Sequence, residues 1–353
     1  MGPVPPSCGR AGVEVSDTAR TRVTVVGAGS WGTAVAAIAA AHGDATLWAR
    51  DPALAEAIAR DRRNDAYLPG IDLPPLRVTA DLTTAVAGAE IVVMGVPSHG
   101  FRDVLVAAAP GIDPDATVVS LVKGVEQGTL LRMTEVATEV LGGDPARIGV
   151  LTGPNLAREV AEGQPTASVA ALADPGRAVA VQRAFMTSTF RVYTNPDVVG
   201  CEIAGALKNV MALAAGIAHG LGYGDNTKAA LITRGLAELA RLGVALGGDP
   251  LTFSGLAGMG DLVATCISDK SRNRTVGVAL GEGRTLDEVV AEMQMVAEGV
   301  KSTRAVLDLA RAHGVEMPIA EQVGAVLYEG RRPAEIVPAL MLREATSELR
   351  GLS

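Results

Sequence analysis

The chain has 353 residues, of which 48% are hydrophobic and 20% charged, and its formal net charge is −8. This length and composition predict a globular protein with two domains and a large core. The negative charge argues against a broad nucleic-acid-binding surface, although a few local cations would still bind a small phosphorylated molecule. The three cysteines are far apart and form neither a metal-binding spacing nor a disulfide framework, which favours a reducing, cytoplasmic environment.

The first 20 residues are rich in proline and glycine and lack the apolar stretch of a secretory signal. We therefore expect residues 1–20 to form a disordered leader outside the fold.

From Arg22 onward, apolar β-branched runs alternate with helical segments. Strands are expected at 23–27, 45–50, 91–97, 117–123 and 148–153, with helices at 30–42 and 52–60. Because these runs show no polar alternation, they predict an α/β fold with a doubly wound, mostly parallel sheet of the Rossmann type. Two more strands are expected at 165–173 and 190–194, at a sheet edge where their direction stays open.

After residue 195 helical patterns dominate. They cover 201–221, 226–246, 285–293, 300–314 and the tail from residue 334. We therefore expect a dinucleotide-binding Rossmann domain over residues 21–195 and an all-α substrate and catalytic domain over residues 196–353.

The segment GAGSWG (27–32) has the spacing G-x-G-x-x-G, follows the first expected strand and opens a helix. In that context Gly27 allows a tight turn, Gly29 lets a pyrophosphate approach the backbone, and Gly32 lets helix and strand pack closely. The free N–H groups at the helix N-terminus then face the phosphates. The motif predicts a dinucleotide cofactor.

The second strand ends in Arg50, where an acidic residue usually holds the ribose hydroxyls of NAD. Arginine pairs well with a 2′-phosphate, so Arg50 favours NADP. The neighbouring Asp51 keeps NAD open.

Lys208 lies in the middle of one of the most apolar segments of the chain. Such a lysine is either a side chain that snorkels from the rim of the core or a catalytic base whose pKa burial has lowered. The segment is as long as a membrane span. Its central Lys208–Asn209 pair favours a buried core helix instead, so we do not expect an integral membrane protein.

Three other places carry polar groups suited to an anionic ligand. Lys123 ends an apolar strand, where open α/β sheets bind their ligands. Asp261 follows a glycine-rich segment, GLAGMG (255–260). Arg272 and Asn273 lie in the segment SRNR (271–274), which is either a phosphate clamp or a solvated cationic turn.

Together these segments resemble the bacterial-type NAD(P)-dependent glycerol-3-phosphate dehydrogenases, from about residue 22 to about residue 345. The resemblance rests on GAGSWGTA (27–34), VKG (122–124), GPNLA (153–157), GALKNVMALAAGI (205–217), NTKAALITRGLAE (226–238), GLAGMGDLVATC (255–266) and SRNRTVG (271–277). A Rossmann fingerprint alone would be far less specific than these segments in one order.

The resemblance implies interconversion of sn-glycerol 3-phosphate and dihydroxyacetone phosphate with NAD(P)H, a supply step for phospholipid synthesis, with Lys208 as proton acceptor and without a metal. The substrate-binding residues it implies are Lys123, Gly153, Asn155, Lys208, Asp261, Ser271, Arg272 and Asn273. The cofactor-binding residues it implies are Gly27, Gly29, Ser30, Trp31, Gly32, Arg50, Tyr67, Lys123, Ala157, Arg272, Val296 and Glu298. Asn155 departs from the family pattern, in which many relatives have Ser or Thr.

Two other functions stay open at this point. One is a related β-hydroxyacid or 6-phosphogluconate-type dehydrogenase, and the other is a non-catalytic NADPH-binding regulator. The pKa of Lys208 is also open, because burial lowers it whereas a nearby Asp261 would raise it. The oligomeric state is not determined by the sequence, and a homodimer is one candidate.

Overall fold

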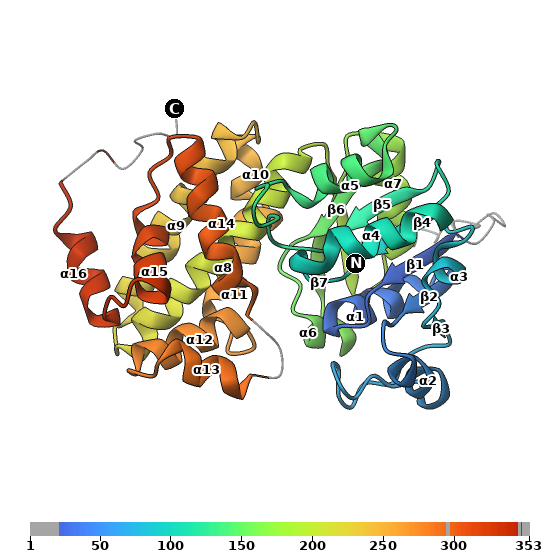
Figure 1. Cartoon of the computed structure of the whole chain (residues 1–353), viewed down its shortest axis with the longest axis horizontal. Coiled ribbons are helices and arrows are strands. Elements are labelled where there is room, and N and C mark those ends of the chain that lie inside the picture. The colour runs from blue at the N-terminus through green and yellow to red at the C-terminus, as the bar shows by residue number, and fades with distance from the viewer. Residues whose placement is uncertain (1–20, 294–296, 345–346, 348–353) are drawn as a thin grey trace, which may run out of the picture.

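The computed structural model of the chain describes residues 21–293, 297–344 and residue 347. A sheet with its covering helices forms one half of the molecule, and helices alone form the other half beside it (Figure 1). The expected leader, residues 1–20, and the expected cofactor contact Val296 lie outside the described residues.

Eight strands form a single sheet in the order β3-β2-β1-β4-β5-β6-β7-β8. Their bounds are β1 Arg22–Val26, β2 Asp44–Trp48, β3 Arg77–Thr79, β4 Ile91–Met94, β5 Thr117–Ser120, β6 Ile148–Thr152, β7 Thr166–Ala171 and β8 Phe190–Asn195. Neighbouring strands are parallel except for β6 and β7, which are antiparallel. The expected doubly wound, mostly parallel sheet is thus confirmed. The short strand β3 was not predicted, because three residues after a proline pair show no clear pattern.

Helices cover both faces of the sheet, and the strands are apolar on both faces for that reason. The helices of this half are α1 Ser30–Ala39, α2 Pro52–Asp61, α3 Leu82–Val86, α4 Phe101–Ala108, α5 Met133–Leu141, α6 Ala157–Ala161 and α7 Pro175–Phe185. One core cluster joins Val93 of β4 to residues of α1, α2 and α7. Its neighbour in sequence, Val92, belongs to a second cluster with residues of α3, α4 and α5.

The second half contains α8 Val198–Gly220, α9 Asp225–Ala245, α10 Pro250–Ser254, α11 Asp261–Ile267, α12 Arg272–Gly281, α13 Leu286–Glu292, α14 Glu298–Ala312, α15 Pro318–Tyr328 and α16 Ile336–Met341. A single π-helical turn, η4 Leu256–Gly260, precedes α11. No strand occurs among the described residues after Asn195. The sequence did not predict α15, nor that the cationic SRNR segment opens a helix.

Helix α8 runs through the centre of this half, and the other helices surround it (Figure 1). It begins at Val198 because the side chain of Asp197 accepts a hydrogen bond from the backbone N–H of Gly200 at 2.8 Å. By length and composition it would span a membrane, but 89% of its most apolar window is buried inside the protein. It is therefore built as the core helix of a globular domain.

Candidate active site

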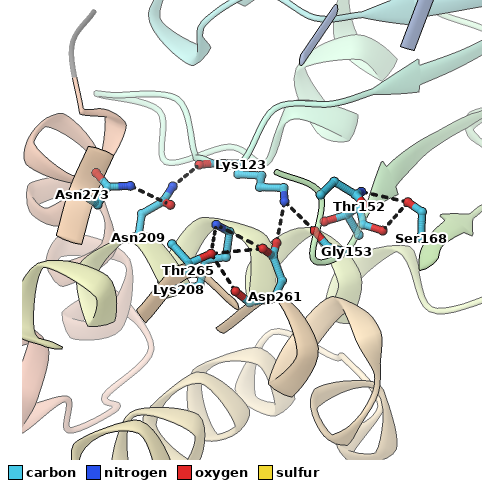
Figure 2. A network of polar contacts seen from close by, with 10 residues as sticks. Lys123, Thr152, Gly153, Ser168, Lys208, Asn209, Asp261, Thr265 and Asn273 are labelled. Carbon is cyan, nitrogen blue, oxygen red and sulfur yellow. Dashed lines mark hydrogen bonds and ion pairs between the residues drawn. The ribbon is translucent and has the colours of Figure 1, made fainter. Parts of the chain in front are cut away.

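The polar groups that the sequence singled out meet where β5 and β6 end against the central helix α8 (Figure 2). Lys123 lies three residues after the last residue of β5, and Gly153 directly follows β6. Lys208 comes from α8, and Asp261 is the first residue of α11. Segments far apart in the chain thus form one cluster at the carboxyl ends of the strands, where open α/β sheets bind ligands.

The side chain of Lys208 is buried and contacts two residues of α11. Its Nζ donates a hydrogen bond to Oγ1 of Thr265 at 2.7 Å and forms an ion pair with Oδ1 of Asp261 at 3.2 Å. Lys208 is only 6% exposed, so the snorkelling interpretation is wrong. A buried ammonium with a carboxylate partner at a ligand-binding edge is typical of a functional site.

Asp261 holds two lysines with one carboxylate. Its Oδ1 faces Lys208, while its Oδ2 accepts a hydrogen bond from Nζ of Lys123 at 2.5 Å. Lys123 also donates to the backbone carbonyl of Gly153 at 2.9 Å. Asp261 is itself only 2% exposed, and its one negative charge balances one of the two lysine charges. The three groups together therefore carry one net positive charge when all of them are ionised. That charge suits an anionic substrate.

Burial is the main reason that the pKa of Lys123 is lowered to about 8; Asp261 opposes the shift, and the positive charge of Lys208 adds to it. A lysine with this pKa changes charge close to physiological pH. The sequence had placed the question of a shifted pKa on Lys208 alone.

A chain of side-chain amides links this cluster to α12 and α14. Nδ2 of Asn209 donates to the backbone carbonyl of Lys123 at 3.2 Å, and its Oδ1 accepts from Nδ2 of Asn273 at 2.9 Å. Oδ1 of Asn273 in turn accepts from the backbone N–H of Gly299 at 2.9 Å. Asn273 is therefore a buried, oriented residue that still has an amide hydrogen for a ligand.

The start of α12 carries the rest of the expected phosphate clamp. Ser271 is the N-cap of α12, and its hydroxyl accepts from the backbone N–H of Arg274 at 3.3 Å. Arg272 is the first residue of the helix, and its positive charge acts on Glu298 at the start of α14. Burial raises the pKa of Glu298, and Arg272 opposes that rise.

The loop after β6 is held against β7. Nδ2 of Asn155 donates to Oγ of Ser168 at 2.9 Å, and that hydroxyl donates to the carbonyl of Thr152 at 2.8 Å. Both Oδ1 of Asn155 and Oγ1 of Thr152 are buried and have no partner within the described structure. Buried acceptors of this kind, next to Gly153, suit the hydroxyl groups of a ligand.

The turn between β1 and α1 has the geometry that the glycine spacing predicts. Gly27 has φ +121°, and a Cβ on Gly32 would lie 2.0 Å from the carbonyl oxygen of Gly27. A Cβ on Gly29 would meet nothing within 4 Å, so the space above it is open. Helix α1 has no side-chain cap, which leaves its first N–H groups for an anion. The residues present therefore fit a dinucleotide pyrophosphate.

Other residues expected to bind the cofactor lie around this turn. The hydroxyl of Ser30 donates to the carbonyl of Tyr67 at 2.6 Å. Trp31 packs against Phe190 with ring centroids 6.2 Å apart, and Ala157 opens α6, which lies against α1. Arg50 is exposed at the end of β2.

Sequence reasoning missed three polar residues of the cluster. Thr265 follows Asp261 by four residues, so the helical spacing would have placed both on one face. Asn209 was noticed only as the neighbour of Lys208. Ser168 had no signal, because its partners lie on β6 and in the loop after β6. Within the described ranges no group of three His, Cys, Asp or Glu residues has metal-binding geometry.

Comparison with known proteins places this chain in a family. Residues 22–178 match the model of the NAD-dependent glycerol-3-phosphate dehydrogenase N-terminus, and residues 197–338 match that of its C-terminus. The chain is 55% identical over 335 residues to a glycerol-3-phosphate dehydrogenase [NAD(P)+] of Thermobifida fusca, covering 94% of this chain and 100% of that one. A relative with the same name from Streptomyces griseus is 54% identical over 331 residues, covering 93% and 98%.

Among solved structures, the glycerol-3-phosphate dehydrogenase of Coxiella burnetii is similar with a TM-score of 0.87 and 36% identity, covering 92% of this chain and 99% of that one. More distant dehydrogenases share the fold alone. A ketopantoate reductase of Ralstonia eutropha reaches a TM-score of 0.56 at 16% identity.

Proposed function

Since the chain belongs to the NAD-dependent glycerol-3-phosphate dehydrogenase family, we propose that it interconverts sn-glycerol 3-phosphate and dihydroxyacetone phosphate with NAD(P)(H). The observation that carries this proposal is the buried Lys123–Asp261–Lys208 cluster at the carboxyl ends of β5 and β6. The sn-glycerol 3-phosphate formed by reduction would supply phospholipid synthesis.

Residues 21–195 hold the cofactor, and residues 196–353 supply the base and most of the substrate pocket. The turn at Gly27, Gly29 and Gly32 and the N-terminus of α1 receive the pyrophosphate. A nicotinamide cofactor held there would supply the hydride for carbon 2 of the substrate in reduction and accept it in oxidation.

Lys208 moves the proton. During reduction its ammonium donates a proton to the oxygen on carbon 2, and during oxidation the neutral amine takes that proton back. The hydrogen bond to Thr265 and the ion pair with Asp261 fix the direction of Nζ. Lys123 lies on the other oxygen of the same carboxylate, so its positive charge stabilises negative charge that develops on the substrate oxygen.

The start of α12 grips the phosphate. Arg272 supplies the charge, and Asn273 supplies an amide hydrogen whose direction Asn209 and Gly299 fix. Ser271 at the N-cap places both residues at the helix terminus, where the N–H groups also favour an anion. Asn155 and Gly153 complete the pocket next to Lys123.

NADP is the favoured cofactor. Arg50 is exposed two residues after the last residue of β2. A cation near the end of β2 suits a 2′-phosphate, which NAD lacks. No metal takes part in this scheme, and we place the enzyme in the cytoplasm.

The alternatives have less support. A β-hydroxyacid or 6-phosphogluconate-type dehydrogenase does not account for the match of both halves of the chain to glycerol-3-phosphate dehydrogenase models. A non-catalytic regulator would have no need for a lysine base beside a phosphate grip.

Replacing Lys208 by alanine tests the proposal. Purified protein should oxidise NADPH with dihydroxyacetone phosphate, and Lys208→Ala should lower kcat by about 10²- to 10⁴-fold because the general acid is lost. The measurement is the decrease in NADPH absorbance, combined with the Kd for NADPH, which should stay near that of the parent protein.

The matched control is Lys228→Ala in α9, where the lysine pairs with the exposed Asp225 at 3.0 Å. It should keep the parent activity. Near-full activity of Lys208→Ala would show that another group moves the proton.

A further inference from the structure

Glu202 is a fully buried carboxylate on α8, six residues before Lys208. The hydrogen bonds and the ion pair of its carboxylate are made to Arg132 and Thr134, in the half of the molecule that contains the sheet. Oε1 accepts from the backbone N–H of Thr134 at 2.9 Å, and Oε2 accepts from the hydroxyl of Thr134 at 2.6 Å. Arg132 Nη1 pairs with Oε2 at 3.1 Å. The scheme above gives this group no task.

These contacts cap helix α5 from a distance. Helix N-termini are usually capped by a local Ser, Thr, Asp or Asn, but the residue at this position is Arg132, whose guanidinium accepts no hydrogen bond. Glu135 in the first turn accepts the backbone N–H of Arg132 at 2.8 Å, and Glu202 supplies the acceptor for the backbone N–H of Thr134. A residue of the central helix thus completes the cap of α5 and ties its first turn to α8.

The segment that enters α5 is the one that carries Lys123. Residues 121–132 leave β5 and fold back, with an isolated β-bridge between Val125 and Arg132. Val125 is buried in the core of the helical half. The segment is thus held on α8 at both ends, by Asn209 at the carbonyl of Lys123 and by Glu202 at Arg132 and Thr134.

Both anchors and the base lie on one rigid helix. With a rise of about 1.5 Å per residue, Glu202 lies about 9 Å along α8 from Lys208. If the contacts of Glu202 were lost, Lys123 could move relative to Lys208 and their shared partner Asp261. Small displacements of a catalytic group lower the reaction rate strongly.

We propose that Glu202 is a positioning residue, which locks residues 121–132 onto α8 and so keeps Lys123 in register with Lys208. The proposal rests on the proposed role of Lys123 in catalysis. Glu202 itself lies too far along the helix to contact the reacting atoms.

The test is a double-mutant cycle of Glu202→Gln and Lys123→Ala. Glutamine keeps the volume but turns one acceptor into a donor that faces Arg132 and Thr134. With Lys123 present, Glu202→Gln should lower kcat/KM for dihydroxyacetone phosphate about tenfold, a coupling of ordinary size for residues in one network. In the Lys123→Ala background, assayed at high enzyme concentration, the loss should be clearly smaller.

The matched control is Glu238→Gln. Glu238 is also a buried carboxylate that receives helix N-terminal N–H groups, those of Ile319 and Ala320 at 2.7 and 3.3 Å, but it lies within the helical half on α9. The Glu238→Gln variant should have a lower unfolding temperature than the parent protein and the same kcat/KM. Hydrogen exchange of residues 121–132 should accelerate in Glu202→Gln and not in Glu238→Gln.

Equal losses from Glu202→Gln in both backgrounds, or unchanged exchange of residues 121–132, would overturn the positioning role. Near-parent activity of Lys123→Ala alone would instead contradict the proposed role of Lys123, so the two failures are distinguishable.

Discussion

At the scale of single residues, the proposed function assigns roles to two lysines. Its apolar surroundings and the family resemblance both point to Lys208, whereas its place after a strand and the same resemblance point to Lys123. The structure puts Lys123 and Lys208 on opposite oxygens of Asp261, at 2.5 and 3.2 Å. Because burial lowers the pKa of Lys123 to about 8, the charge of Lys123 changes near physiological pH.

The pH dependence of the reaction follows from that pKa. Lysine is charged below its pKa and neutral above it, so the attraction of Lys123 for an anionic substrate is present below pH about 8 and lost as the pH rises through it. We expect kcat/KM for dihydroxyacetone phosphate to fall on this alkaline side, since kcat/KM reports groups of the free enzyme.

Lys123→Arg is the diagnostic variant, because a guanidinium keeps its charge up to pH about 12. It should be less active, since the fork of arginine does not fit the place of an ammonium, and the fall near pH 8 should disappear. An unchanged profile in Lys123→Arg would assign the titration to another group.

At the scale of elements, two glycines in the turn between β1 and α1 are present for different reasons. Gly32 is required by the fold, because a Cβ there would lie 2.0 Å from the carbonyl oxygen of Gly27. Gly29 is not, because a Cβ there meets nothing within 4 Å. In the proposed function, the pyrophosphate of the cofactor occupies this open space at Gly29.

Alanine substitutions should separate these uses. Gly32→Ala should lower the unfolding temperature, because the helix must move away from the strand at a cost of about 1–3 kcal/mol. Gly29→Ala should leave the unfolding temperature of the cofactor-free protein unchanged and raise the Kd for NADPH. Thermal unfolding and fluorescence titration measure the two effects. Unchanged NADPH affinity in Gly29→Ala would place the pyrophosphate elsewhere.

At the scale of the whole molecule, α8 joins the parts of the site. It carries Lys208 and Asn209, its Glu202 reaches the sheet half, and α12 with the SRNR segment packs directly on it. This last contact is close because glycines face one another. A Cβ on Gly216 would lie 2.2 Å from the carbonyl oxygen of Arg274 and 2.8 Å from Cα of Gly277.

Gly216→Ala should therefore push α12 and its phosphate grip away from α8. We expect a lower unfolding temperature, with a loss of about 1–3 kcal/mol for overpacking, and a raised KM for dihydroxyacetone phosphate. Gly324→Ala in α15 is the control, since the closest atom to its Cβ would be Cδ1 at the end of the Leu307 side chain, at 2.5 Å, and no backbone atom is among its three nearest neighbours. If both variants raised KM equally, the close α8–α12 packing would not be what positions the grip.

The sequence by itself determined what local order encodes. Apolar runs without alternation specify buried parallel strands, the glycine spacing specifies the turn before α1, and a lysine in an apolar helix is a candidate for a functional residue. Only the tertiary structure decided which partners meet. Asp261 reaches Lys123 across 138 residues of chain, and Glu202 reaches Thr134 across 68. Such contacts depend on how α8, α11 and the segment after β5 pack together. No local pattern along the chain predicts which of these distant residues come into contact.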